Sequence, residues 1–328
     1  MDIGALLPHV GLNSSATAMR DVAQAGEDMG FGSLWGADHI VMPKHYEPKC
    51  PFNDEGRFPI PGERPFLELF QSLAFAAAVT TRVKLGVSVC IVPCRHPAYL
   101  AKSVTTLDTL SEGRFIFGVG VGWMKEEFDV LDEPFRQRGR RTDETLEFLQ
   151  NAWSAEQPVS FHGEHIHLDE VYFSPQPNRP SGVETWVGGG SDVALRRTVR
   201  FGTAWQSHLY GAEPGSIRRT LAKIRDLQAE YDRSDVRIPA TMFLPIELAD
   251  TDDPALPPTM GVPLPQGHAR SPARDSVDLR RRGGGARPAR LRWRHPAQAR
   301  DGGAGPRRGA ERGLIDRRRA ARVRRSGG

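Results

Sequence analysis

The sequence predicts an α/β protein, a (β/α)8 TIM-type barrel that is incomplete at its C-terminus. Two observations predict it. Short apolar or β-branched segments alternate with segments of helical spacing from residue 2 to about residue 248, which is typical of a parallel sheet with crossover helices. The chain has 328 residues, 39% of them hydrophobic, enough for one such barrel and a remainder.

The expected elements follow in order along the chain. Strands are predicted where short apolar runs are bounded by turn residues, at 2–10, 32–36, 83–92, 114–119, 184–187, 202–206 and 238–248. Helices are predicted where apolar residues recur at three and four positions, at 16–29, 66–80, 97–110, 138–153, 192–201 and 214–231. Gly30 ends the first helix and Pro97 begins the third. An eighth strand, which would close the ring, is not found.

Two further segments interrupt this alternation. Residues 43–65 form a long proline-rich loop, and a loop of this length in a compact domain is usually functional. Residues 158–173 alternate apolar and polar positions around His162-Gly163, which predicts a hairpin inserted into the barrel. We expect both segments to shape a substrate pocket.

The composition changes after residue 254. Residues 270–328 contain 19 arginines, no lysine and 5 acidic residues, whereas residues 1–269 carry 25 basic and 35 acidic residues. We therefore predict a barrel domain at 1–254 and an Arg/Gly/Pro-rich tail at 255–328, disordered because it cannot bury enough apolar surface. Its composition resembles out-of-frame GC-rich coding, so we hypothesise a reading-frame shift near residues 254–270.

These distributions exclude several classes of protein. The net charge of +4 comes from the tail, so it does not indicate a specific nucleic-acid binder, although the tail would attract nucleic acid electrostatically. No apolar run is long enough for a membrane span, and no signal peptide precedes the first strand, so we expect a cytoplasmic protein. The three cysteines, Cys50, Cys90 and Cys94, include no CxxC pair, and Cys90 and Cys94 are interpreted as core or strand-end residues.

Asp38 and His39 follow the second predicted strand. In a barrel of this type the site lies at the C-terminal ends of the strands. Histidine changes protonation near neutral pH and a carboxylate can tune it, so His39 is a candidate catalytic residue steadied by Asp38. The alternative is a hydrogen-bonded pair that ties down the following loop.

The third predicted strand ends in Val87-Ser88-Val89, followed further on by His96 and Pro97. Strand ends that must curve around a flat ring often carry bulges or unusual peptides, so these residues, with His96, are candidates for cofactor binding. The alternative for His96 is a position near the cap of the helix that Pro97 begins.

Glycines at the fourth predicted strand end form a third candidate. Gly118, Gly120 and Gly122 alternate with valines, and small residues let a planar ligand approach the backbone. We interpret Gly120 and Gly122 as cofactor-binding. The spacing does not match a GxGxxG dinucleotide fingerprint, so a Rossmann interpretation is disfavoured.

Gly188, Gly189, Gly190 and Ser191 lie between a strand and a helix. Backbone N–H groups at a helix N-terminus bind phosphate, and this turn is the candidate phosphate site; the alternative is a flexible turn. His162, His165 and His167 are not interpreted as metal ligands because they alternate along the hairpin, so no metal site is predicted.

Taken together, these segments resemble the luciferase-like monooxygenase family, and within it the branch that uses the deazaflavin coenzyme F420. The segments that carry the resemblance are 4–8, 30–39, 56–59, 95–97, 106–114, 118–123 and 186–190, in the order of the family over roughly residues 1–250. Family members continue with an acidic helix and a final strand, and neither is found here.

The resemblance implies a cofactor, F420 or alternatively FMN, bound over the strand ends. It implies that Asp38 and His39 lie beside the ring, that a non-prolyl cis peptide within 87–89 backs the ring, and that Gly188–Gly190 bind the phosphate. It further implies that the strand-four glycines border the ring and its side-chain channel.

The expected function is hydride transfer between F420 and a small organic substrate. An FMN-dependent two-component monooxygenase is one alternative, and an inactive relic or binding protein is another. A small-molecule substrate is the expected partner, and a homodimer is left open.

Overall fold

The computed structural model describes residues 2–51, 53, 55–154, 156–208 and 214–243, with three short strands at 247–249, 278–279 and 289–292. Its main sheet is parallel and runs in the order β1-β2-β3-β5-β8-β9-β10, with β4 also pairing to β5. The strands are β1 (Gly4–Leu6), β2 (Ser33–Gly36), β3 (Lys84–Val87), β4 (Cys90–Ile91), β5 (Phe115–Gly120), β8 (Glu184–Gly188), β9 (Ala204–His208) and β10 (Ala240–Phe243). The predicted α/β architecture is confirmed.

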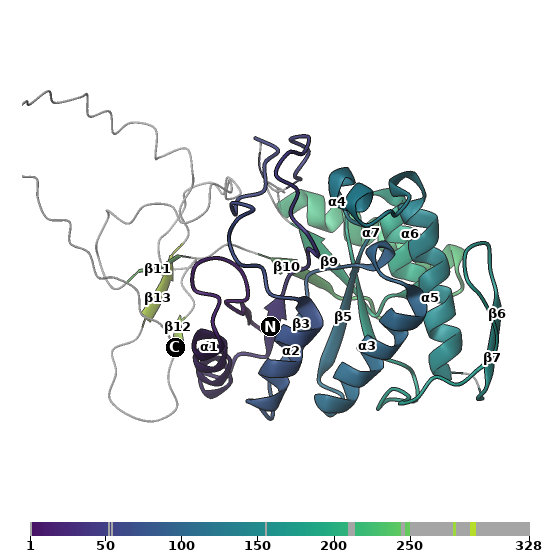
Figure 1. The fold of residues 1–328 in the computed structure, drawn as a ribbon, viewed down its shortest axis with the longest axis horizontal. Helices are drawn as coiled ribbons and strands as arrows, with labels where there is room; N and C mark the ends of the chain where they lie inside the picture. The colour runs from purple at the N-terminus through teal and green to yellow at the C-terminus, as the bar shows by residue number, and fades with distance from the viewer. Residues whose placement is uncertain are drawn as a thin grey trace, which may run out of the picture. The chain divides into compact units, whose positions relative to one another are not determined.

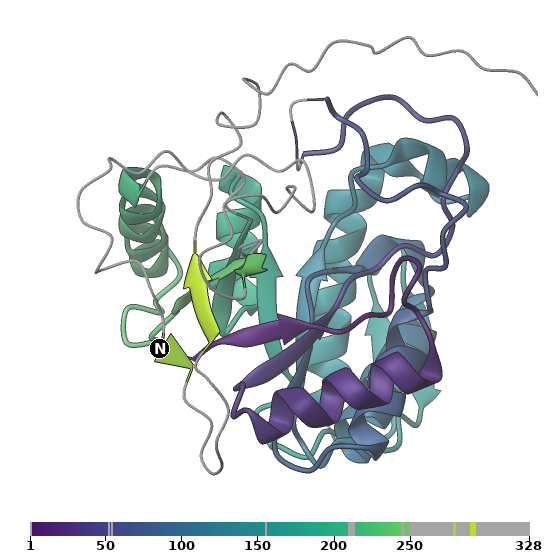
Figure 2. The same cartoon turned by 90° about the vertical axis from the view of Figure 1, so that its left-hand side faces the viewer.

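Helices connect these strands and cover the outer face of the sheet (Figures 1 and 2). They are α1 (Ala16–Asp28), α2 (Leu69–Ala78), α3 (Pro97–Leu110), α4 (Lys125–Val130), α5 (Arg138–Ser154), α6 (Asp192–Phe201) and α7 (Pro214–Glu230). Local signals begin and end them: Ser15 caps α1 by accepting from Ala18 N, Pro97 starts α3, and Gly30 follows α1 with a positive φ of 82°.

The sheet curls, because residues on strands that are not neighbours meet across its inner face. The rings of Trp35 on β2 and Trp186 on β8 are 5.0 Å apart, although β3 and β5 lie between these strands. Gln206 on β9 donates through Nε2 to the carbonyl of Val87 on β3 at 3.4 Å. This curvature is that of a partial barrel, and within the described residues β1 and β10 are the two ends of the pairing path.

The core explains why β5 is continuously apolar. All six of its residues are buried, since helices cover one face and the barrel interior fills the other. Phe115 and Phe117 pack with Leu85, Leu100 and Leu107 in the main core cluster. Each large side chain of this kind contributes roughly 1.5–3 kcal/mol on burial, so the cluster holds the strand ends in place.

The structure differs from the sequence predictions mainly at element boundaries. The predicted strand 83–92 is two short strands, because a non-prolyl cis peptide at Ser88–Val89 separates β3 from β4. The predicted helix 66–80 begins only at Leu69, where the Glu68 side chain accepts from Gln71 N. Helix α4 was not predicted, since its six residues are too few to show helical spacing.

Two smaller sheets lie outside the main sheet, one formed by the hairpin and one by short C-terminal strands. Strands β6 (Val159–His162) and β7 (His167–Val171) form the predicted hairpin, but as a separate antiparallel sheet beside α5 rather than in the barrel wall. Strand β11 (Glu247–Ala249) pairs with β13 (Ala289–Arg292), which also pairs with β12 (Asp278–Leu279). The remainder of the tail predicted at 255–328, with its frame-shift hypothesis, lies outside the described residues and stays a prediction.

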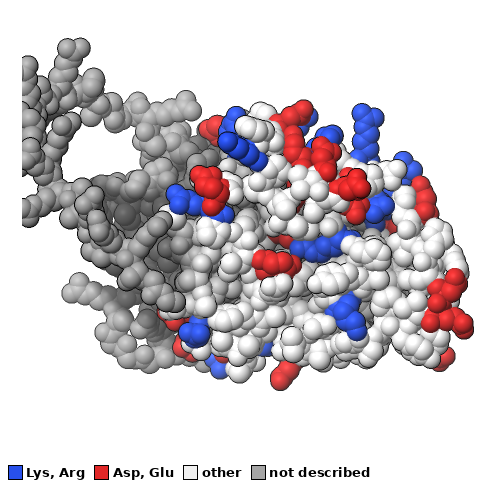
Figure 3. Space-filling model, viewed as in Figure 1, with Lys and Arg blue, Asp and Glu red and all other residues white. Residues whose placement is uncertain are grey.

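The surface charge and the helices of the described residues bear on two of the excluded classes, the nucleic-acid binders and the membrane-spanning proteins. On the face shown in Figure 3, acidic and basic side chains are interspersed over the described residues and form no continuous basic patch. None of the described helices combines the length and the apolar character that crossing a bilayer requires.

Candidate active site

The C-terminal ends of β2, β3, β5 and β8 lie along one edge of the sheet, because all their pairings are parallel. The sequence-predicted residues follow these ends: Asp38 and His39 after β2, Ser88 and Val89 after β3, Gly122 after β5, and Gly189 after β8. The topology therefore places most of the predicted site on the edge where barrel enzymes bind their ligands.

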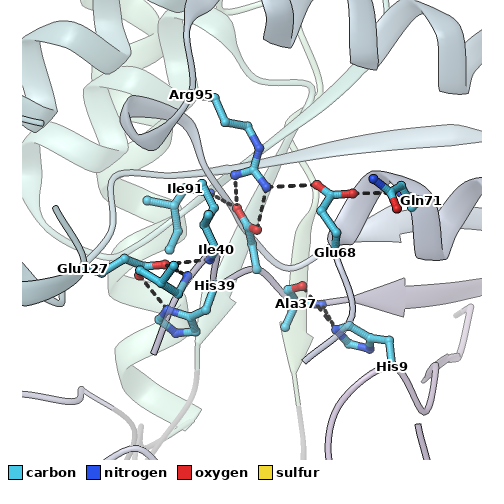
Figure 4. A network of polar contacts seen from close by, with 11 residues as sticks. His9, Ala37, His39, Ile40, Glu68, Gln71, Ile91, Arg95 and Glu127 are labelled. Carbon is cyan, nitrogen blue, oxygen red and sulfur yellow. Dashed lines mark hydrogen bonds and ion pairs between the residues drawn. The ribbon is translucent and has the colours of Figure 1, made fainter. Parts of the chain in front are cut away.

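His39 is held by a buried carboxylate that the sequence did not single out. His39 Nδ1 lies 2.7 Å from Glu127 Oε2, and the side chains are 6% and 1% exposed (Figure 4). The other carboxylate oxygen, Oε1, accepts the backbone N–H groups of Ile40 at 2.7 Å and Val41 at 3.3 Å. Glu127 thus forms hydrogen bonds with both the imidazole of His39 and the backbone that follows it.

This pattern assigns the tautomer of His39. A carboxylate whose Oε1 accepts two N–H groups is an acceptor at Oε2 as well, so Nδ1 carries a proton and donates it. The lone pair of the neutral ring is then on Nε2, for which the described residues offer no hydrogen-bond partner. Nε2 is the atom that is available to exchange a proton.

The expectation that Asp38 steadies His39 is wrong. Asp38 accepts from both guanidinium nitrogens of Arg95, Nη1 at 2.5 Å and Nη2 at 2.9 Å, and from Ile91 N at 2.8 Å. The two neighbours therefore bond to different partners, His39 to Glu127 and Asp38 to Arg95 and Ile91. Asp38 is 5% exposed and joins the end of β2 to the segment after the cis peptide.

Close packing among the strand ends accounts for the glycines on and after β5, which the sequence analysis placed at the fourth predicted strand. A Cβ on Gly118 would lie 1.8 Å from the Val87 carbonyl oxygen, and one on Gly120 would lie 2.2 Å from Val89 Cγ2. Gly122 has a φ of 76°, and its Cβ would meet Phe128 at 2.7 Å. The glycines therefore admit protein groups, in particular Val89, where the sequence suggested the approach of a ligand.

Aromatic rings surround His39. Phe58 and Phe66 meet it edge-on with centroids 4.9 Å and 5.7 Å away, and Trp123 does so at 6.1 Å. Phe58 comes from the proline-rich loop, whose backbone N–H at Phe58 donates to the Tyr46 hydroxyl at 3.0 Å. The loop thus places an aromatic ring against His39, and its role in shaping a substrate pocket stays a prediction.

Helix α4 fastens this loop as well as the histidine. Glu126 Oε1 accepts the backbone N–H of Glu47 at 2.8 Å, while the neighbouring Glu127 holds His39. Lys125 forms an exposed ion pair with Asp129 on the same helix. Two adjacent carboxylates therefore couple the loop and the candidate proton carrier to one short helix.

The inner face of the barrel contains a polar atom that lacks a partner. Gln206 is 4% exposed, and its Oε1 has no hydrogen bond among the described residues. This oxygen lies near Gly118 and the Val87 carbonyl, directly before the cis peptide. A buried acceptor of this kind is usually satisfied by a water or a ligand, so the position fits a polar group of a bound cofactor.

The Gly188–Ser191 turn lies at the same edge but makes no hydrogen bond with the His39 network among the described residues. Gly189 has a φ of 106°, which favours glycine, and its carbonyl accepts from Trp205 Nε1 at 2.6 Å. Ser191 caps α6 through Oγ, accepting from Ala194 N at 3.3 Å. A Cβ on Gly190 would meet nothing within 4 Å, so space is open beside the turn.

His96 does not join the network. It is the N-cap residue of α3, is exposed, and makes no side-chain capping bond. It lines a cavity beside α3 and α5 instead. The alternative interpretation, a position at the helix cap, is the one that the geometry supports.

Burial favours the neutral form of three further side chains at this edge, His9, Cys90 and Cys94. Burial lowers the pKa of His9, which accepts from Ala37 N at 2.8 Å and is 2% exposed. Burial raises the pKa of the Cys90 and Cys94 thiols, so neither is a ready nucleophile. All three cysteines are buried, Cys90 and Cys94 as predicted, and no cluster of three His, Cys, Asp or Glu suited to a metal occurs in the described part.

Comparison with known proteins decides the family. The profile of the luciferase-like monooxygenases matches residues 1–314. The chain belongs to the luciferase-like monooxygenase family. The fold is thereby that of a TIM barrel, and the resemblance seen in the sequence is confirmed.

Individual relatives show how broad the family is. An uncharacterized protein of Mycobacterium tuberculosis is 32% identical over 227 residues, covering 67% of this chain and 77% of the relative. The solved structure of an F420-dependent secondary alcohol dehydrogenase in complex with an F420-acetone adduct superimposes with a TM-score of 0.61 at 20% identity, covering 74% of this chain and 68% of that chain. The oxygenating constituent of a Pseudomonas putida Baeyer–Villiger monooxygenase, in complex with FMN, has a TM-score of 0.55 at 17% identity, covering 70% and 63%.

Sequence reasoning missed Glu127, Arg95 and Gln206 as residues of the site. Arg95 lies within the segment that carries the family resemblance, and its position next to a strand end was a usable signal. Glu127 lies on a helix too short to predict, and Gln206 ends a predicted strand in an otherwise apolar context. The sequence around Glu127 and Gln206 does not indicate that either side chain faces the site.

Proposed function

We propose that this family member is an F420-dependent oxidoreductase that moves hydride between the coenzyme and a small organic substrate, with His39 handling the accompanying proton. The observation that carries the proposal is the buried His39–Glu127 pair at the strand ends, with aromatic rings packed around the imidazole. The F420-dependent neighbour supports it at the level of fold.

The residues present are suited to a flavin-type cofactor. We assign its ring to the edge formed by Val87, Ser88 and Val89 with Gly120 and Gly122, and its phosphate to the turn at Gly188–Ser191. The unpartnered Gln206 Oε1 and the open space beside Gly190 support this assignment. When bound, F420 would supply the site that accepts or donates hydride.

Side chains of this protein would accept and return the proton that accompanies hydride transfer. Glu127 keeps Nδ1 protonated, so Nε2 accepts a proton from a substrate hydroxyl during oxidation and returns it during reduction. Asp38 and Arg95 hold the backbone on either side of the site in position. Phe58, Phe66 and Trp123 surround the imidazole with apolar surface and favour substrates with an apolar face.

The first experiment titrates the purified full-length chain with F420 and with FMN and follows fluorescence. We expect F420 to bind at micromolar concentration and its absorbance to change on addition of secondary alcohols or ketones. The variant His39→Asn should bind the coenzyme equally well and turn over at least a hundredfold more slowly. If neither cofactor binds, the proposal is rejected.

An FMN-dependent monooxygenase is the second candidate, favoured by the FMN-containing neighbour. Tighter binding of FMN than of F420, and turnover that consumes oxygen when a reductase is supplied, would replace the first proposal. A thermal melt by circular dichroism, run beside a chain with a family-like C-terminus restored, tests the third alternative. A cooperative transition argues against an inactive relic.

A further inference from the structure

A cavity of about 280 Å³ lies beside α3 and α5, and Pro93 and Arg95, which follow β4, also line it. Its walls are the start of α3, the first half of α5 and the β6–β7 hairpin. The hairpin is fastened over it by Glu144 on α5, whose Oε1 accepts the backbone N–H groups of His165 at 2.7 Å and Ile166 at 2.8 Å. The cavity therefore depends on the hairpin, which is not part of the main sheet.

Two nitrogen atoms at this cavity are buried without a hydrogen-bond partner among the described residues. They are Arg141 Nε, on α5, and His165 Nε2, at the tip of the hairpin. Arg141 uses only Nη2, which donates to Glu133 at 2.9 Å. The nearest carboxylate oxygen to His165 Nε2, on Glu164, is 3.8 Å away and beyond hydrogen-bonding distance.

Arg141 Nε requires an acceptor, and His165 Nε2 can donate to one when it carries the proton. A guanidinium is always charged and its Nε–H can only donate, so leaving it buried and unpaired costs free energy. The exposed imidazoles of His96 and His167 stand at the same cavity and add further donors. Of the carboxylates near the cavity, Glu133 is paired with Arg141 and Glu144 holds the hairpin backbone, while Glu164 is 63% exposed.

The rest of the lining is apolar. Pro97, Ile166, Leu168 and Phe173 contribute most of the remaining wall. A group that satisfies both parts has anionic oxygens at one end and an apolar body at the other. Arg95 also lines the cavity, but its guanidinium is turned to Asp38 and is paired there.

We propose that this cavity is a binding site for a small organic anion, a carboxylate or phosphate ester with an apolar body, held by Arg141 and His165. Neither His39 nor the Gly188–Ser191 turn lines this site, whereas Pro93 and Arg95, from the segment after the cis peptide, do. It does not depend on which cofactor the enzyme uses.

The test is isothermal titration of the full-length chain with benzoate, phenyl phosphate, inorganic phosphate and benzyl alcohol. Benzoate or phenyl phosphate should bind with 1:1 stoichiometry at sub-millimolar concentration, and the tighter of the two identifies the anionic group. Benzyl alcohol, which lacks the charge, should bind at least tenfold more weakly, as should inorganic phosphate, which lacks the apolar body.

Variants locate the binding. Arg141→Met and His165→Phe should each raise the dissociation constant at least tenfold, whereas Arg140→Met should leave it unchanged, because Arg140 is 74% exposed and does not line the cavity. Arg141→Lys keeps the charge but loses Nε, and should still weaken binding severalfold. If Arg141→Met fails to fold, His165→Phe decides alone. Absence of binding, or binding that neither variant weakens, overturns the proposal.

Discussion

Glu127 Oε2 and His39 Nδ1 lie 2.7 Å apart although 88 residues separate them in the chain. Both side chains are almost fully buried, and the second carboxylate oxygen holds the backbone that follows His39. The pair fixes which ring nitrogen is free, so it determines how the proposed proton carrier can act.

Replacing Glu127 tests this relationship. In Glu127→Gln only one oxygen can accept, so either His39 Nδ1 or Ile40 N loses its partner. We expect kcat to fall about 10–100-fold, with little change in cofactor affinity and with a displaced pH profile. Steady-state kinetics across pH measure this. Glu126→Gln, on the same helix, is the matched control and should affect loop order more than the pH profile.

Replacing Asp38 should mainly reduce stability, whereas replacing His39 should mainly reduce turnover. Asp38→Asn weakens the buried pair with Arg95, whose side chain is 7% exposed, and should cost about 3 kcal/mol of unfolding free energy. His39→Asn should cost much less stability but most of the turnover. Urea unfolding of both variants checks this, and Glu68→Gln, at a 40% exposed partner of Arg95, should cost less than about 1 kcal/mol. Equal stability of wild type and Asp38→Asn would contradict the structural role.

Gly120 should not tolerate a side chain. In Gly120→Ala the new Cβ would lie 2.2 Å from Val89 Cγ2, so Val89 must move at a cost of about 2 kcal/mol, and cofactor affinity should fall. Adding Val89→Ala removes the clashing methyl and should restore part of the loss. Gly190→Ala, whose Cβ meets nothing, should stay within about 0.5 kcal/mol of wild type by thermal unfolding.

Glu27 should make stability depend on acid pH. Burial alone would raise its pKa, but the N–H groups of Val83, Arg82 and Thr81 outweigh it and lower the pKa to about 2 from 4.5. A lowered pKa in the folded state stabilises the fold above about pH 4.5, and this contribution is lost as pH falls from about 4.5 to about 2.

The measurement compares wild type with Glu27→Ala in urea at pH 7, 4 and 3. The variant should be about 2 kcal/mol less stable at pH 7, and the difference should shrink at each lower pH. Glu27→Gln keeps an acceptor oxygen and should lie between the two, with a smaller dependence on pH. A difference that is constant with pH would show that the carboxylate charge is not involved.

Much of the architecture could be predicted from the sequence because it depends on local patterns. Alternating strand and helix signals determined the parallel α/β order, and Gly30, Pro97 and Ser191 determined helix ends through their own backbone chemistry. The order of motifs determined the family. It also indicated a non-prolyl cis peptide within 87–89, which the structure places at Ser88–Val89.

Only the tertiary structure decided how the site is connected. That His39 pairs with Glu127, that Asp38 pairs with Arg95, and that Gly120 makes room for Val89 follow from the curl of the sheet. The curl brings together segments that no local pattern relates. Periodicity reports which face of an element is apolar, whereas the partner of a buried polar group depends on the three-dimensional path of the whole chain.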